Sequence, residues 1–136
     1  MRKGADVFVD QLKQAIQNEY KDYHFYKSMY EQTKDPLWRD FIQHMIEDEK
    51  SHYEMFQQLY YMLTGTFVQN PKKPIPCYNF KECVKQALVD ELEAVEMYKE
   101  MLLTIPIQQA YNPLFIAMHD EMEHAIRMST IYNSLR

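Results

Sequence analysis

The sequence contains little glycine, with only two glycines and six prolines among its 136 residues. Glycine supplies the unusual backbone angles of tight hairpin turns, so the chain has few places for them. We therefore expect few turns and long regular elements between them. The length suits a single domain with a real apolar core, and is too short for two ordinary domains.

Several other features are missing. No apolar run approaches the roughly 18 residues of a membrane span, and the amino end has no apolar region typical of a signal peptide. Acidic residues exceed basic ones by twenty to fifteen, which argues against nucleic acid or an anionic membrane as a partner. Cys77 and Cys83 lack the Cys-x-x-Cys spacing and are too few for a disulfide scaffold, so we expect reduced thiols. The expected location is the cytoplasm.

Helix-breaking residues lie in three places, at Asp35-Pro36, within 65–76 and at Ile105-Pro106. Between them, apolar residues recur every three or four positions, which is the period of an amphipathic helix. Candidate inward-facing residues include Leu12, Ile16, Tyr23, Tyr26, Phe41, Met45, Phe56, Leu63, Val84, Leu88, Val95, Tyr98, Leu102, Leu114, Met118, Ala125, Met128 and Leu135. The pattern predicts four helices, at about 5–33, 36–64, 79–104 and 108–135.

The middle connection, at about 65–78, is much longer than an antiparallel helical hairpin needs. Its roughly 14 residues reach about 45 Å when extended, and a helix of roughly 29 residues is about 43 Å long. The connection can therefore run the whole length of the bundle. We predict an all-α single domain over 1–136, a four-helix bundle whose two antiparallel hairpins are joined by this crossover.

The chain also matches itself when shifted by 72 positions. The matching pairs are Phe8/Phe80, Lys13/Lys85, Gln14/Gln86, Ala15/Ala87, Glu19/Glu91, Tyr26/Tyr98, Lys27/Lys99, Met29/Met101, Asp48/Asp120, Glu49/Glu121, His52/His124, Tyr60/Tyr132 and Leu63/Leu135. Helical periodicity alone would match apolar positions, whereas many of these pairs are polar. We therefore predict an internal repeat, in which two copies of one hairpin are related by a pseudo-two-fold axis.

The repeated polar residues have the spacing of metal ligands. Glu19 and Glu49 are equidistant from the first predicted turn, so they lie at the same height in the first hairpin. Glu91 and Glu121 have the same relation in the second hairpin. In each Glu-x-x-His pair, Glu49 with His52 and Glu121 with His124, the three-residue step keeps both side chains on one helix face.

The charge of these side chains indicates what they bind. Four carboxylates inside a bundle are too costly to leave unpaired, and two divalent cations would neutralise them. Ligands that are mostly oxygen, with one nitrogen per metal, favour iron(II) or manganese(II) over a structural zinc. One Glu from each of two helices, with a Glu-x-x-His from each of the others, is the ligand set of ferritin-like dinuclear proteins.

On these residues the sequence resembles the ferritin-like superfamily of di-iron carboxylate proteins, and within it the rubrerythrins and bacterioferritins. The resemblance implies that Glu49 and Glu121 bridge the metals, that Glu19 and Glu91 are terminal ligands, and that each histidine binds one metal. It also implies that Tyr26 and Tyr98 lie close to the site, where we expect them to hydrogen-bond a ligand carboxylate or water. Asp48 and Asp120, which precede the bridging glutamates, are expected to hydrogen-bond the ligand histidines.

Several positions depart from these families. Rubrerythrins typically carry a further glutamate where this chain has Ala94, and usually append a rubredoxin domain with paired Cys-x-x-Cys motifs, of which this chain has none. The haem-binding methionine of bacterioferritins is replaced by Lys50, and the chain stops before a fifth helix. We therefore expect no haem and no storage cage.

The expected function is a redox reaction of two iron ions with hydrogen peroxide or dioxygen, as in a peroxide reductase or ferroxidase. A separate protein would supply the electrons. Two alternatives stay open, manganese catalase-like disproportionation of peroxide and metal binding or sequestration without catalysis. Aromatic residues outside the inward stripe, such as Tyr20, Phe25, Tyr61 and Phe115, suggest a homodimer.

Overall fold

Four helices follow the breaker residues in the computed structural model, which describes residues 4–69 and 71–135. These are α1 (Gly4–Gln32), α2 (Pro36–Thr64), α3 (Phe80–Leu103) and α4 (Tyr111–Ser134), with a short 3-10 helix, η1 (Gln108–Ala110), before α4. The described residues contain no strand, and the predicted all-α four-helix bundle is confirmed. The predicted domain limits of 1–136 include residues 1–3, 70 and 136, which lie outside the described residues.

The ends of α2 and α3 are set by side chains of the type that caps helices. The Asp35 carboxylate accepts hydrogen bonds from the backbone N–H groups of Leu37 and Trp38, at 2.9 and 3.0 Å. Gly65 ends α2 with a φ of 81°, a left-handed conformation that suits glycine. Asn79 caps α3 by accepting a hydrogen bond from the N–H of Glu82 at 3.1 Å.

The last helix begins three residues later than the sequence predicts, at Tyr111 in place of 108. Ile107 is extended, and the next three residues form the 3-10 turn η1. Pro113 then lies in the first turn of α4, where the N–H that proline lacks has no partner within the helix. The proline therefore fixes where the regular helix can start.

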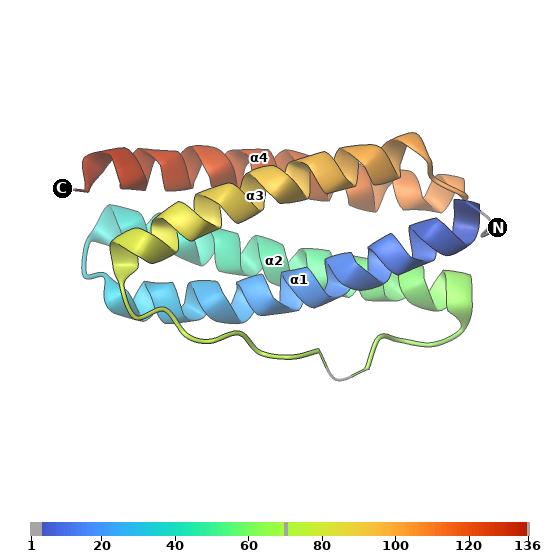
Figure 1. Ribbon diagram of the computed structural model, residues 1–136, viewed down its shortest axis with the longest axis horizontal. Coiled ribbons are helices and arrows are strands. Elements are labelled where there is room, and N and C mark those ends of the chain that lie inside the picture. The colour runs from blue at the N-terminus through green and yellow to red at the C-terminus, as the bar shows by residue number, and fades with distance from the viewer. Residues whose placement is uncertain (1–3, 70, 136) are drawn as a thin grey trace.

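The crossover runs along the length of the bundle from the end of α2 to the start of α3 (Figure 1), as its length predicts. Two side chains attach it to the first hairpin. The Gln57 amide donates to the backbone oxygen of Val68 at 3.0 Å, and its oxygen accepts from the N–H of Val68 at 2.8 Å. The N–H of Cys77 donates to the Ser28 hydroxyl at 2.8 Å.

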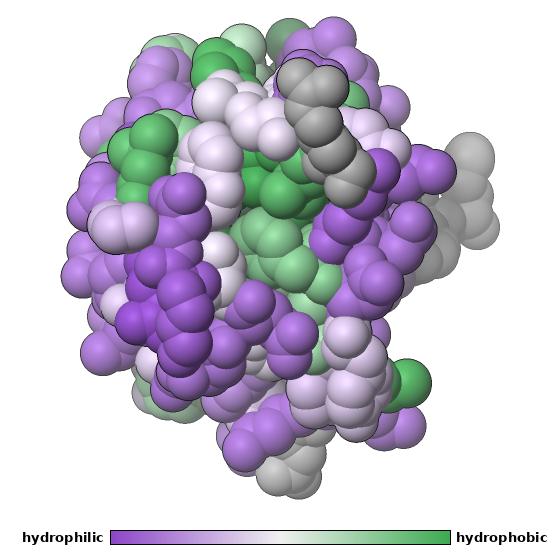
Figure 2. Space-filling view, turned by 90° about the vertical axis from the view of Figure 1, so that its left-hand side faces the viewer, coloured by the Kyte–Doolittle hydropathy of each residue, from purple (hydrophilic) through white to green (hydrophobic). Residues whose placement is uncertain are grey.

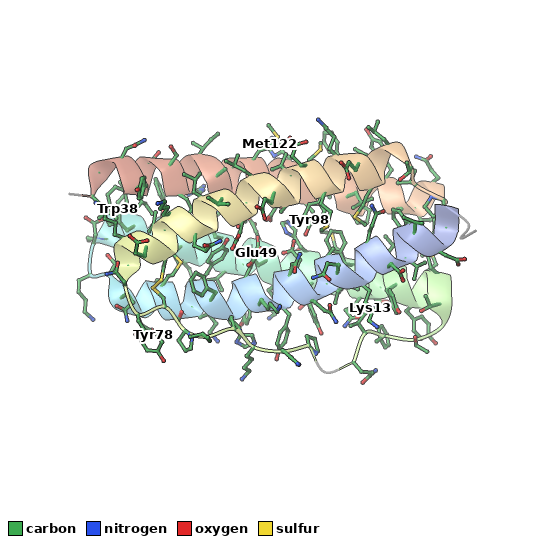
Figure 3. All side chains as sticks on the ribbon, in the orientation of Figure 1. Lys13, Trp38, Glu49, Tyr78, Tyr98 and Met122 are labelled. Atoms are coloured by element: carbon green, nitrogen blue, oxygen red, sulfur yellow. A yellow bond between two sulfur atoms is a disulfide. The ribbon has the colours of Figure 1, made fainter. Side chains whose placement is uncertain are left out.

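The prediction that Cys77 and Cys83 are reduced thiols is wrong, because the structure joins them in a disulfide. Five residues lie between them, and this segment turns from the crossover into the first turn of α3, which brings their Cα atoms to 6.1 Å. That separation lies within the range of a disulfide. Figure 3 shows the bond where the crossover meets α3.

The interior consists of two apolar clusters. Cluster A contains Phe8, Leu12, Ala15, Ile16, Phe56, Leu59, Val68, Tyr98, Met101, Ala110, Leu114 and Ala117. Cluster B contains Tyr26, Met29, Ile42, Met45, Ile46, Cys77, Cys83, Val84, Ala87, Met128 and Ile131. Along the sequence of every helix, the residues of one cluster precede the repeated Glu or Glu-x-x-His residues, and the residues of the other cluster follow them. Figure 2 views the bundle from the end where α4 stops, with apolar side chains in its middle and polar ones around them.

The aromatic residues that suggested a dimer differ in exposure. Tyr61 and Phe115 are 48% and 45% exposed, whereas Tyr20 and Phe25 are half-buried. The homodimer stays a prediction. In the described part of the chain, no helix is both long and apolar enough to cross a membrane.

We predict that Gln57→Leu destabilises the protein by about 1–3 kcal/mol, because it leaves the buried N–H and carbonyl of Val68 without partners. Gln58→Leu, at the exposed neighbouring position, is the matched control and should change little. Urea unfolding followed by circular dichroism measures both. Equal midpoints for the two variants would show that Gln57 does not hold the crossover.

Candidate metal centre

Six ionisable side chains from all four helices meet in the middle of the bundle, between clusters A and B. They are Glu19, Glu49, His52, Glu91, Glu121 and His124, and none is more than 1% exposed. Figure 3 shows Glu49 in the middle of the bundle, facing its interior. Charged side chains are rarely buried so completely unless they are paired or bind metal.

The six residues form two groups that have two members in common. Glu19, Glu49, His52 and Glu121 offer ligand atoms within 4.8 Å of one another, and so do Glu49, Glu91, Glu121 and His124. The shared members are therefore Glu49 and Glu121. Each group adds one carboxylate and one imidazole to the shared pair, so the six residues could hold two adjacent cations.

Two aspartates orient the histidine rings. Nε2 of His52 donates to the Asp120 carboxylate at 2.7 Å, and Nε2 of His124 donates to Asp48 at 2.8 Å. Each aspartate comes from the other hairpin, so these hydrogen bonds also join α2 to α4. An ionised carboxylate only accepts, so these contacts place a proton on Nε2, and a neutral ring held in this orientation would offer its Nδ1 lone pair to a metal.

Both Nδ1 atoms point at the carboxylates. Nδ1 of His52 lies 3.3 Å from Glu19 and 3.2 Å from Glu121. Nδ1 of His124 lies 3.0 Å from Glu49 and 3.4 Å from Glu91. Nδ1 of His52 also lies 3.8 Å from Glu49, and Nδ1 of His124 lies 3.5 Å from Glu121, so each nitrogen faces one unshared glutamate and both shared ones.

The buried donor atoms fit a pair of divalent cations. Among the described residues, the buried side-chain atoms without a hydrogen-bond partner are both carboxylate oxygens of Glu49, both of Glu121, Oε2 of Glu91 and Nδ1 of His124. Leaving buried polar atoms unpaired is costly, and they are rare in native proteins. Every one belongs to the two groups, and carboxylate with imidazole is a donor set that suits iron or manganese.

The pKa values show how strongly these groups interact without cations. Burial, and then the charge of Glu121, raises the pKa values of Glu49 and Glu91 well above their usual range. Burial would lower the pKa of His52, but the charge of Glu19 and hydrogen bonds raise it to about 12. Burial would raise the pKa of Glu121, but its close contacts with Glu91 and His52 lower it. Protons therefore hold the cluster together where cations would otherwise do so.

Two tyrosines hold the unshared glutamates. The Tyr26 hydroxyl donates to Glu91, and the Tyr98 hydroxyl donates to Glu19. Burial raises the pKa of both phenols, and the charge of the glutamate that each one contacts raises it further. Both hydroxyls therefore stay protonated and act as donors.

Sequence reasoning missed one acidic residue beside the centre. Asp22 lies one helical turn after Glu19, and burial followed by the charges of Glu19 and Glu121 raises its pKa well above the usual range. It lines a cavity of about 380 Å³ together with Ala94 and Tyr98. Its position three residues after Glu19 was the available signal, and its counterpart 72 residues later is Ala94.

The fold is shared with several solved structures. A hypothetical protein from Pyrococcus furiosus has a TM-score of 0.82 at 22% identity, over 93% of this chain and 88% of that one. A protein from Bacillus anthracis described as a ferritin-like, diiron-carboxylate protein has a TM-score of 0.82 at 17% identity, over 97% and 99%. A conserved hypothetical protein from Mycobacterium tuberculosis has a TM-score of 0.80 at 9% identity, over 98% and 96%.

No curated protein matches the chain. The family model described as Rubrerythrin matches residues 10–125, which include all six buried ionisable residues of the centre. The chain therefore belongs to the rubrerythrin family, and its buried carboxylate and histidine cluster fits the di-metal centre of a ferritin-like protein.

Proposed function

We propose that this chain is a non-haem di-iron protein whose reduced metal pair reacts with hydrogen peroxide or dioxygen, as a peroxide reductase or ferroxidase. Glu49 and Glu121 would hold both ions, with Glu19 and His52 completing one site and Glu91 and His124 the other. The observation that carries the proposal is that the buried atoms without partners all belong to two ligand groups sharing two glutamates.

Iron is favoured over manganese by likeness to known proteins. The matching family is Rubrerythrin, and the similar structure from B. anthracis is described as diiron-carboxylate. When bound, the iron pair supplies two electrons, one from each ion, to the oxidant. The protein must supply the rest, which is ligand geometry, proton donors and a closed environment.

The residues around the centre have different roles in the proposed reaction. Asp48 and Asp120 keep both histidine rings aimed inward, so that Nδ1 stays available. Glu19 and Glu91 each belong to a single group and are each held by one tyrosine hydroxyl. Each of these tyrosine hydroxyls orients the carboxylate that it contacts, and would place a hydrogen-bond donor next to an oxidant bound at the centre. We therefore place Tyr26 and Tyr98 in the reactive site.

The cavity beside Asp22 is the route by which small species reach the centre in this proposal. It lies between α1, α3 and the crossover, where it is lined by Pro74, Asp90 and Glu93 in addition to Asp22. Acidic walls raise the local concentration of cations. Tyr98, which contacts Glu19, forms part of the same lining and connects the cavity to the ligands.

The chain is expected to bind two iron ions, and Glu49→Ala/Glu121→Ala to bind fewer than one, because both bridging ligands are lost. Glu47→Ala/Glu54→Ala removes two exposed carboxylates of α2 outside the centre and is the control. Metal analysis after iron(II) loading and desalting gives the stoichiometry, and circular dichroism checks folding. Unchanged iron content in the first variant would show that the ions bind elsewhere.

Anaerobic protein loaded with two iron(II) ions per chain should be oxidised within seconds when mixed with hydrogen peroxide or dioxygen, as followed by the absorbance of iron(III). The same protein loaded with manganese should not evolve oxygen from peroxide. Failure of both oxidants to oxidise the iron would contradict the redox proposal. Oxygen evolution by the manganese form would favour a catalase.

Ala94→Leu fills part of the cavity and should slow iron(II) uptake several-fold while the final content stays at two ions per chain. Glu96→Leu, on the exposed face of the same helix, adds a similar apolar side chain away from the cavity and serves as the control. Stopped-flow loading with a coloured iron(II) chelator as competitor measures the rate. Equal uptake rates in the two variants would exclude the cavity as the route.

A further inference from the structure

The disulfide between Cys77 and Cys83 lies in the interior of the domain. The two residues are 3% and 8% exposed, and both belong to cluster B. Cys83 is in the first turn of α3, the helix that carries Glu91 eight residues later. At 1.5 Å per residue, the sulfur-bearing turn is about 12 Å along the helix from that ligand.

One side chain connects this disulfide to the centre. Tyr26 belongs to cluster B with both cysteines, and its hydroxyl donates to Glu91. Its counterpart Tyr98 makes the same contact with Glu19 but belongs to cluster A, which contains no cysteine. Among the described residues, the disulfide and a tyrosine that contacts a ligand glutamate therefore share an apolar cluster on one side of the centre alone.

The position of the pair suits reversible oxidation. Cys83 lies near the N-terminus of a helix, where the backbone dipole stabilises a thiolate. Cys77 lies outside the helices, beside Tyr78, which is 79% exposed. A segment without regular structure can open locally and expose its sulfur to an external thiol at little cost.

We propose that Cys77 and Cys83 form a redox-active pair that passes two electrons to the oxidised metal centre. The two thiols lose two electrons and two protons as the S–S bond forms, and two iron(III) ions each gain one electron to become iron(II). The reduced pair then gives these electrons to hydrogen peroxide, which takes up two protons and yields two water molecules. An external dithiol reduces the disulfide by exchange and becomes a disulfide itself.

This inference rests on the proposed redox function, and a peroxide titration separates the two. Wild-type protein is prepared anaerobically in its dithiol and disulfide forms, and each is loaded with two iron(II) ions per chain. The dithiol form holds four reducing equivalents, so it should consume about two peroxide molecules per chain and end with its cysteines joined. The disulfide form holds two equivalents and should consume about one. Alkylation followed by mass spectrometry measures what fraction of the cysteines are free thiols and what fraction are joined in the disulfide.

Two controls test whether the electrons pass through the metal. Metal-free dithiol protein should form the disulfide at least ten-fold more slowly, since its thiols can react only directly with peroxide. Tyr26→Phe should slow thiol oxidation in the iron-loaded protein more than Tyr98→Phe, because Tyr26 lies in the same apolar cluster as the two cysteines and Tyr98 lies in the other. Cys77→Ser/Cys83→Ser should behave as the wild-type disulfide form does, consuming about one peroxide per chain.

Three outcomes overturn the inference. If the iron is oxidised while both cysteines stay reduced, the disulfide is a structural link and the proposed function stands. If metal-free protein forms the disulfide as quickly as loaded protein, the thiols react without the metal. If peroxide does not oxidise the iron even in the disulfide form, the proposed function fails and this inference fails with it.

Discussion

The structure depends on one electrostatic constraint, which is the need to neutralise four carboxylates buried in the middle of a helical bundle. Glu49 and Glu121 have no hydrogen-bond partner on any of their four oxygens, and packing alone does not offset the free energy of such burial. Two divalent cations satisfy these atoms. The other features of the domain follow from this requirement, because the ligands must arrive from four helices at one level, and apolar clusters must close the bundle on both sides of them.

The crossover allows ligands from both hairpins to meet at one level, and it also makes the two hairpins differ. Contacts at the centre come in pairs 72 residues apart, as in the hydrogen bonds from Tyr26 to Glu91 and from Tyr98 to Glu19. Outside the ligands the two halves differ. Asp22 corresponds to Ala94, which leaves room for a cavity, and Cys83 corresponds to Gln11, so the disulfide lies on one side only. In our proposals, a centre whose candidate ligands are nearly symmetric is therefore reached differently on its two sides, by small species through the cavity and by electrons through the cysteines.

The fold could be predicted from the sequence because its signals are local and repeated. Apolar periodicity and breakers located the helices, and the length of the crossover determined how the hairpins are joined. Equal spacing of Glu19 and Glu49 about a turn brought the candidate ligands to one level. Features that depend on tertiary contacts were not predictable in this way. The disulfide requires a turn between Cys77 and Cys83 that their spacing does not specify, the 3-10 turn before Tyr111 depends on local backbone geometry, and the role of Asp22 appears only once α1 faces α3. The repeat axis stays a prediction.

The central claim is that two cations lie between the helices and share Glu49 and Glu121. Anomalous diffraction at the iron absorption edge, from crystals of protein loaded with iron(II), tests it most directly. The account predicts two peaks inside the bundle, one beside His52 and Glu19 and the other beside His124 and Glu91, with both bridging glutamates between them. A single peak, or peaks confined to the surface, would contradict it.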